Sequence, residues 1–191
     1  MNIYTIVLPT YNDWKSLSIL LIQIEKYLKN TKNIYKVLII DDNSSETNKY
    51  RLNKNKFFKE IKILRLKNNV GSQKAIATGL KFISKYQKKR EDKFIIMDSD
   101  GEDDPVEVPK MIELAMKNSK YIITSNRKSR KESKLIVFLY HTHLLLTFLF
   151  TFKWLSFGNF TSFRKENLSR LFIDNSLFLS LIHISEPTRL N

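Results

Sequence analysis

The sequence predicts an α/β fold with a mainly parallel, Rossmann-like sheet flanked by helices, and three observations support this prediction. Short apolar runs rich in β-branched residues alternate with longer segments that carry apolar residues at helical spacing. Such alternation is typical of βαβ units, which build parallel sheets. Polar clusters follow four of the five predicted strands, at the edge where open parallel sheets bind ligands. The chain has 191 residues and no cysteine, so we expect one domain without disulfides or thiolate metal sites.

The amino-terminal part of the chain begins with a strand, a helix and a second strand. Residues 3–8 (IYTIVL) are an apolar run closed by Pro9, which predicts a buried strand. Residues 14–28 carry tryptophan, leucine and isoleucine at helical spacing, which predicts an amphipathic helix. Residues 34–40 (IYKVLII) predict a second strand, which ends at the polar residues 41–44.

The rest of the chain alternates in the same way. We expect, in order, a short strand at 61–66, a helix at 73–86 capped by Ser72, a strand at 93–97, a helix from Pro105 to about Lys117, and a strand at 120–124. The polar turn 68–72 and the acidic loop 98–104 lie between these elements.

The net charge is +14, and lysine supplies most of the cations. This charge fits a nucleic-acid binder, a peripheral membrane protein, or lysines spread over solvated faces. Lys29, Lys56, Lys81 and Lys117 are scattered along the chain, which favours the last arrangement. No aromatic-basic platform is visible, so we expect no nucleic-acid partner. The first residues lack a basic region before their short apolar run, so we also expect no signal peptide.

The acidic loop carries the strongest chemical signal. Asp98 and Asp100 follow a predicted strand, and residues i and i+2 of an extended chain point the same way. Their carboxylates would repel each other unless a cation lay between them, and hard oxygen ligands suit Mg²⁺ or Mn²⁺. Glu102 continues the alternation and is a candidate third ligand, directly or through water. The same letters also fit a solvated acidic turn.

Two further features suit phosphate. Arg127 and Arg130 follow the fifth predicted strand, and guanidinium groups bind phosphate in a bidentate manner. The alternative for Arg130 is a basic surface loop. Gly71 precedes a helix, where glycine permits close backbone approach and the helix terminus attracts anions. The alternative is an ordinary turn glycine.

Six segments in consistent order resemble family 2 glycosyltransferases, and most closely the dolichyl/polyprenyl-phosphate sugar transferases. They are VLPTYND (7–13), IIDDNSSE (39–46), NNVGSQKAIATGL (68–80), MDSDGEDDP (97–105), SNR (125–127) and FGNFTSFRKE (157–166), and the resemblance covers about residues 3–172. It implies a GT-A fold and an inverting transfer from a UDP- or GDP-sugar to a polyprenyl- or dolichyl-phosphate lipid. It also implies a place at the cytoplasmic face of the membrane, in the synthesis of cell-envelope glycans.

The resemblance also implies roles for individual residues. Asp98 and Asp100 would bind metal and diphosphate, Arg127 would meet the phosphates, and these three form the expected catalytic group. The nucleotide-sugar site is expected to comprise Pro9, Thr10, Tyr11, Asp13, Asp41, Asp42, Gly71, Ser99, Arg127 and Arg130.

Two positions depart from the family pattern. Glu102 stands where relatives often have glutamine, and Asn159 stands where many lipid-phosphate members have aspartate. Neutral Asn159 cannot accept a proton, whereas a hydroxyl acceptor would need a base. A phosphate acceptor is already ionised and needs no strong base. A lipid phosphate and a growing saccharide both stay open as acceptors.

The carboxyl-terminal third contains two unusual segments. Residues 135–157 are mostly apolar and long enough for a membrane span, but His141, His143 and Lys153 interrupt them. We therefore favour helices that pack on the core or lie in the membrane interface. Residues 179–189 (LSLIHISEPTR) resemble a translated sequencing adapter. We accordingly expect a truncated catalytic domain over residues 1–178 and an artefactual tail over 179–191.

Two other function classes are compatible with a parallel sheet. The residues after the first strand distinguish each of them from this chain. A receiver-type signalling domain carries its acidic pair after the first strand, where this chain has Pro9, Thr10 and Tyr11. A nucleotidyltransferase should have a glycine-rich, arginine-containing loop at the same place, and PTYND is not such a loop.

Overall fold

The computed structural model describes residues 2–46, 52, 57–86, 93–118, 120–125 and 160–168. The strands are β1 (Ile3–Thr10), β2 (Ile34–Asp41), β3 (Glu60–Arg65), β4 (Lys93–Ile96), β5 (Ile123–Thr124) and β6 (Thr161–Arg164). The helices are α1 (Trp14–Leu28), α2 (Ser72–Tyr86) and α3 (Val108–Lys117), the last preceded by the 3-10 turn η2 (Pro105–Glu107).

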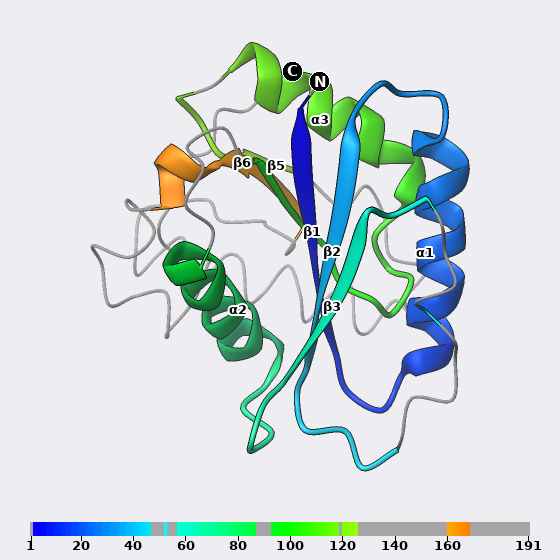
Figure 1. Ribbon diagram of the computed structural model, residues 1–191, viewed down its shortest axis with the longest axis vertical. Helices are drawn as coiled ribbons and strands as arrows, with labels where there is room; N and C mark the ends of the chain where they lie inside the picture. Colours follow the sequence, from blue (N-terminus) through cyan, green and yellow to red (C-terminus); the bar gives the residue numbers. More distant parts are fainter. Residues whose placement is uncertain are drawn as a thin grey trace, which may run out of the picture.

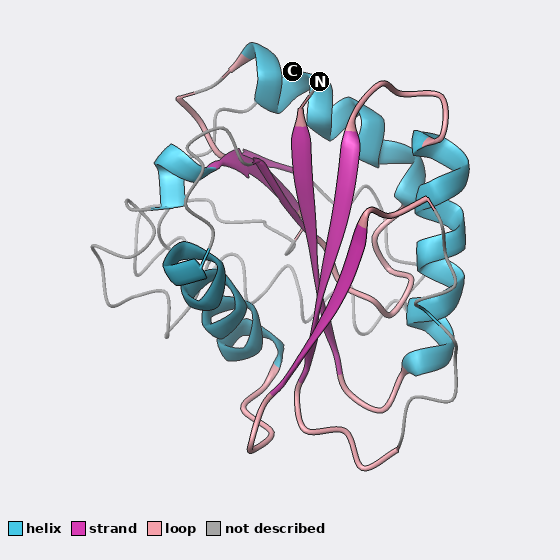
Figure 2. Cartoon of the chain, viewed as in Figure 1, coloured by secondary structure: helices cyan, strands magenta, loops and turns pink. Residues whose placement is uncertain are grey.

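Within these ranges the strands form a six-stranded sheet in the order β3-β2-β1-β4-β6-β5, with helices on either side (Figure 1, Figure 2). Strands β3, β2, β1 and β4 are parallel, whereas β6 runs antiparallel to both β4 and β5. The predicted α/β architecture with a mainly parallel sheet is therefore confirmed.

Several predicted boundaries were wrong. Pro9 does not close β1, because the strand continues through Pro9, opposite Ile40, to Thr10. Proline is tolerated wherever the ladder needs no N–H from that residue. Ser72 lies inside α2, and Gly71 occupies the cap position because its carbonyl accepts the Ala75 N–H at 2.9 Å.

The sheet differs from expectation most at its β5–β6 end. The fifth strand is only Ile123–Thr124, shorter than the predicted 120–124. The sequence analysis did not predict a strand at Thr161–Arg164, yet β6 lies between β4 and β5. Its pairing joins segments far apart in the chain, so local pattern alone carried too little information to predict it.

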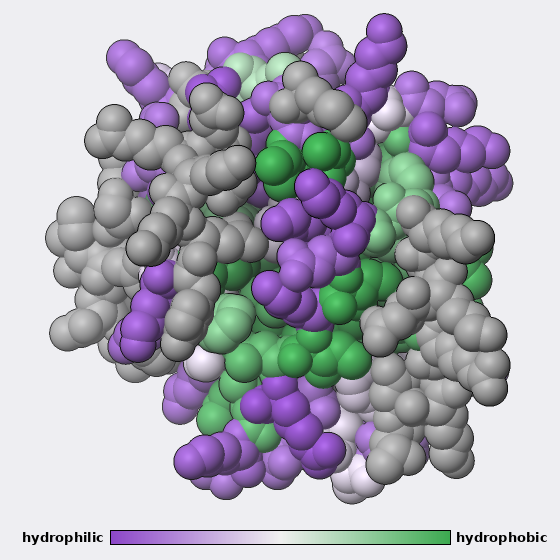
Figure 3. Space-filling model, viewed as in Figure 1, coloured by the Kyte–Doolittle hydropathy of each residue, from purple (hydrophilic) through white to green (hydrophobic). Residues whose placement is uncertain are grey.

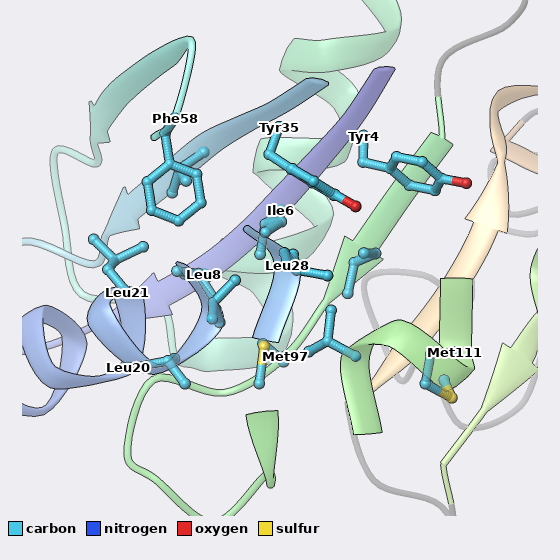
Figure 4. Packing of buried hydrophobic residues seen from close by; sticks show 14 of the residues in the cluster. Tyr4, Ile6, Leu8, Leu20, Leu21, Leu28, Tyr35, Phe58, Met97 and Met111 are labelled. Atoms are coloured by element: carbon cyan, nitrogen blue, oxygen red, sulfur yellow. The ribbon is translucent and has the colours of Figure 1, made fainter. Parts of the chain in front are cut away.

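Alternate residues along β1 enter two different layers of the core. Tyr4, Ile6 and Leu8 belong to the cluster covered by α1 and α3, whereas Val7 belongs to the cluster covered by α2. Figure 4 shows the leucines of α1 beside Ile6 and Leu8, with Tyr4 and Tyr35 next along the sheet. The two tyrosine rings stack with their centroids 5.7 Å apart. Burial on both faces explains the continuous apolar runs of the central strands.

Hydrophilic side chains of the described residues are spread over one face of the molecule (Figure 3). On the face shown in Figure 3, hydrophilic side chains of the described residues lie around the outline and across the middle, over an apolar band. At the β3 edge, Glu60 pairs with Lys62 at 2.9 Å and with Lys36 at 3.4 Å. Charged side chains on an edge strand hinder pairing with another sheet.

Among the described residues, no helix combines the length and apolarity that crossing a membrane requires. Residues 135–157, for which we expected core or interface helices, lie outside the described part of the chain, and so do residues 179–191. The proposed division at residue 178 stays a prediction.

The contact between α2 and β2 yields a test of the packing. A Cβ added to Gly79 would collide with the side chain of the fully buried Ile40. We expect Gly79→Ala to lower the free energy of unfolding by about 1 kcal/mol, because overpacking costs about 1–3 kcal/mol and the better helix propensity of alanine returns up to about 1 kcal/mol. Urea denaturation measures this change.

A double mutant provides the control. Ile40→Val removes the methyl group that the new Cβ would meet. The combination of both changes should therefore be more stable than the sum of the two single effects predicts. Strict additivity would show that the two side chains do not meet.

Candidate functional site

The carboxyl ends of β1 and β2 and the loops that follow them lie together at the lower edge of the sheet in Figure 1. The Asp42 N–H donates to the Thr10 carbonyl at 2.9 Å. The Ser99 hydroxyl, just past β4, donates to the Pro9 carbonyl at 2.6 Å. The structure thus brings together residues that are 90 positions apart in sequence, as we expected from the parallel sheet.

The β1 end supplies one fully buried and one exposed candidate. Thr10 is only 3% exposed, and its hydroxyl has no hydrogen-bond partner in the described structure. Tyr11 is 52% exposed, so its ring is open to solvent at the same edge. Asp13 caps α1, because its carboxylate accepts the Ser16 N–H at 3.1 Å. This structural role does not exclude the predicted role of Asp13 in nucleotide binding.

Asp41 is buried at the end of β2, and its carboxylate has partners within the protein. Its carboxylate accepts the Ser44 N–H at 2.9 Å and lies 3.6 Å from the Arg65 Nε. The Arg65 guanidinium also donates to the Ser44 carbonyl at 2.8 Å. Asp41 therefore shapes the loop that follows β2.

Asp42, equally buried, connects this loop to the next turn. Its two carboxylate oxygens accept the N–H groups of Val70 and Gly71, each at 2.8 Å. Carboxylate oxygens have two lone pairs each, so these bonds leave acceptor capacity for a ligand. The Gly71 N–H, at the amino end of α2, donates to the Asp42 carboxylate, so this helix end already contacts one anionic group of the chain. Gly71 has φ +85°, a conformation that favours glycine.

The acidic loop divides its carboxylates between two environments. Asp103 is 3% exposed and accepts the Asp98 N–H at 2.8 Å, which holds the start of the loop. Asp98 itself is half-buried, whereas Asp100 and Glu102 are exposed. The Asp100 carboxylate accepts the Glu102 N–H at 2.9 Å across Gly101, which has φ +85°.

The expected extended geometry does not hold past Asp98, because residues 99–101 form a bend. In the part of the chain that the structure describes, no three His, Cys, Asp or Glu side chains form a group able to hold a metal ion. Asp98, Asp100 and Glu102 therefore do not form a ready-made three-carboxylate centre, and their role as metal ligands stays a prediction. Their oxygen chemistry fits a cation that keeps waters and takes few carboxylates plus substrate phosphates.

Arg127, Arg130 and Asn159 lie outside the described residues. The nearest described residues are Ser125 on the side of the two arginines and Phe160 on the side of Asn159. A hydrogen bond connects them, since the Ser125 N–H donates to the Phe160 carbonyl at 2.9 Å. Since β5 runs parallel to β4, Ser125 follows β5 at the same edge of the sheet as the acidic loop.

Four residues that organise this edge were not predicted from the sequence: Asn12, Ser44, Arg65 and Asp103. All four act through hydrogen bonds to other segments or to the loop backbone. A positive φ at Asn12 is typical of asparagine and glycine, but the sequence does not identify which asparagine adopts it.

Residues 5–181 match the family model described as glycosyl transferase family 2. The chain belongs to glycosyl transferase family 2. This membership confirms the resemblance of the six sequence segments, and it leaves the receiver-type domain without support.

Two curated relatives have names that contain a lipid phosphate. The chain is 28% identical over 123 residues to the dolichol-phosphate mannosyltransferase of Pyrococcus furiosus, covering 64% of this chain and 32% of that protein. It is 25% identical over 135 residues to the undecaprenyl-phosphate 4-deoxy-4-formamido-L-arabinose transferase of Proteus mirabilis, covering 70% and 39%. The chain thus spans between about a third and two fifths of the length of these relatives.

Two solved structures show the same fold. TarS 1–349 of S. aureus superposes with a TM-score of 0.55 at 17% identity, over 91% of this chain and 49% of that one. The mannosyltransferase PcManGT from Pyrobaculum calidifontis, in complex with GDP-Man and Mn²⁺, has a TM-score of 0.55 at 14% identity, over 88% and 46%. The predicted GT-A fold is confirmed.

The two bonds of Asp42 generate a stability prediction. We expect Asp42→Asn to lower the free energy of unfolding by about 2 kcal/mol, because the amide keeps one acceptor oxygen and turns its NH₂ group toward a backbone N–H. Thermal or urea denaturation measures the change.

Glu113→Gln is the matched control for removing a carboxylate charge. Glu113 is exposed and pairs with Lys117 at 2.6 Å, and exposed pairs contribute little, so the free energy of unfolding should barely change. An Asp42→Asn protein as stable as the control would show that the turn at 70–71 does not depend on this carboxylate.

Proposed function

We propose that this protein transfers a sugar, with inversion, from a UDP- or GDP-sugar to a polyprenyl or dolichyl phosphate in a metal-dependent reaction. The observation that carries the proposal is the hydrogen bond from the Ser99 hydroxyl to the Pro9 carbonyl. It places the start of the acidic loop beside the loop expected to bind the nucleoside. A nucleotide diphosphate spanning both loops would have its base on one side and its phosphates on the other.

The nucleoside side would be formed by the loops after β1 and β2. The buried Thr10 hydroxyl lacks a partner in the described structure, and a buried hydroxyl gains from a ligand that supplies one. The exposed Tyr11 ring is suited to stacking on a base. Pro9, Asp13, Asp41 and Asp42 would complete this side, the two buried aspartates through their remaining lone pairs.

The diphosphate side would be formed by the acidic loop. Asp98 and Asp100 would hold Mg²⁺ or Mn²⁺, with Glu102 contributing directly or through water. The bound ion would neutralise negative charge on the departing nucleoside diphosphate. Within the loop, the buried Asp103 keeps Asp98 in place through its backbone N–H. Arg127, Arg130 and the α2 amino end at Gly71 would add positive potential toward the phosphates.

A lipid phosphate is the acceptor that best fits the sequence. Both curated relatives named above carry a lipid phosphate in their names. A phosphate is ionised near neutral pH, so it can attack without a strong base, which agrees with the neutral Asn159. Such an acceptor would place the protein at the cytoplasmic face of the membrane.

Donor binding can be measured by thermal shift with a panel of nucleotide diphosphates. At about 100 times the Kd, a ligand stabilises the native state by about 2.7 kcal/mol, or roughly 5–10 °C for a chain of this size. We expect UDP or GDP to raise Tm by such an amount in Mn²⁺ and by less in a chelator.

Asp100→Asn should abolish the metal-dependent part of this shift. Asp104→Asn is the matched control in the same loop, because Asp104 is exposed and caps η2 through the Val106 N–H, a role that asparagine also fills. A metal-dependent shift that survives Asp100→Asn would remove Asp100 from the ligand set.

The acceptor is tested with a radiolabelled nucleotide sugar. We expect label to pass to polyprenyl or dolichyl phosphate in detergent and not to soluble oligosaccharides, with Asp104→Asn again matching wild type. Incorporation into soluble sugar alone would replace the lipid acceptor with a saccharide acceptor.

A further inference from the structure

Asn12 occupies an unusual position between β1 and α1. Its backbone has φ +53°, in the left-handed region that asparagine and glycine adopt most readily. It is one of two non-glycine residues with positive φ in the described chain, the other being Asn43 at +61°. Asn12 is half-buried, between the exposed Tyr11 and the helix cap Asp13.

Asn12 holds the loop that follows β2 with three hydrogen bonds. Its backbone N–H donates to the Ser44 hydroxyl at 2.9 Å. Its side-chain oxygen accepts the Ser45 hydroxyl at 3.2 Å and the Glu46 N–H at 3.1 Å. One residue therefore contacts three successive residues that are 32 to 34 positions away in sequence.

The two ends of this loop are held by different means. Ser44 is fully buried, and Asp41 and Arg65 bind its backbone. Ser45 and Glu46 are exposed, and the Trp14 indole N–H donates to the Glu46 carbonyl at 3.2 Å. Water competes for the hydrogen-bonding groups at this exposed end of the loop. The conformation of Ser45 and Glu46 therefore depends on a partner with fixed geometry, and the Asn12 side chain is such a partner.

We propose that Asn12 is a positioning residue that holds loop 42–46 against loop 10–13 and so pre-forms the nucleoside side of the donor site. The inference rests on the proposed function, because it needs a nucleotide between these loops. Both lone pairs of the Asn12 side-chain oxygen are occupied by loop 42–46, so this oxygen acts on the site through the loop. Pre-forming a site raises affinity because less ordering remains to be done on binding.

The test compares two glycine substitutions. Asn12→Gly keeps the positive φ and removes the side-chain contacts, whereas Asn118→Gly removes an asparagine hydrogen bond, to the Leu114 carbonyl at 3.1 Å, at the carboxyl end of α3 and outside the proposed site. We expect Asn12→Gly to raise the Kd for UMP or GMP and for UDP or GDP about tenfold, and Asn118→Gly to raise neither more than about twofold. Isothermal titration calorimetry measures both constants.

Three further readouts separate positioning from general damage. The loss on Asn12→Gly should be equal for mono- and diphosphate and independent of Mn²⁺, because the metal side is untouched. Tm without nucleotide should change by no more than a few degrees. Asn12→Asp keeps an acceptor oxygen for Ser45 and Glu46, so its Kd should stay within about threefold of wild type.

The outcomes separate this inference from the proposed function. Wild-type protein that binds none of these nucleotides contradicts the proposed function itself. Wild-type binding with an unchanged Kd in Asn12→Gly, or with an equal loss in Asn118→Gly, overturns the role of Asn12 alone. If Asn12→Gly does not fold, Ser45→Ala decides, since loss of this exposed contact should weaken nucleotide binding about threefold and an unchanged Kd overturns the inference.

Discussion

The buried carboxylates at the end of β2 constrain the rest of the site. Asp41 and Asp42 are each 3% exposed, and a buried charge is tolerated only when hydrogen bonds replace its water. The donors come from Ser44, Arg65, Val70 and Gly71. Satisfying two side chains therefore fixes the loop after β2, the end of β3 and the start of α2 at one edge of the sheet.

This requirement changes how the acidic motifs are understood. A sequence rich in aspartate at strand ends suggests ligands, and the structure shows that several of these aspartates also hold backbone in place. Asp13 caps α1, Asp42 holds the turn at 70–71, and Asp103 binds the Asp98 N–H. Asp100, Glu102 and Asp104 are the exposed carboxylates of the acidic loop, and the first two are proposed metal ligands. In this chain, the supporting Asp103 thus lies within a few residues of the proposed metal ligands Asp98 and Asp100.

Local signals predicted much of the fold and part of the site. The helix at 14–28 was predicted with both ends correct, because its apolar spacing is a local property. The placing of residues 9–11, 41–42 and 98–100 at one edge followed from parallel strands alone. The bend at 99–101 was missed, since the positive φ of Gly101 overrides the alternation of an extended chain.

The sequence by itself determined the family, the α/β alternation and the set of polar residues at the strand ends, because periodicity and motif order are written along the chain. Only the tertiary structure decided that β6 enters antiparallel between β4 and β5, that Asp42 bonds to the 70–71 turn, and that Asn12 spans two loops. Each of these depends on a hydrogen bond or a strand pairing between residues about 28 or more positions apart. The free energy of such a contact depends on burial and geometry that the whole sheet sets, so no local pattern specifies it.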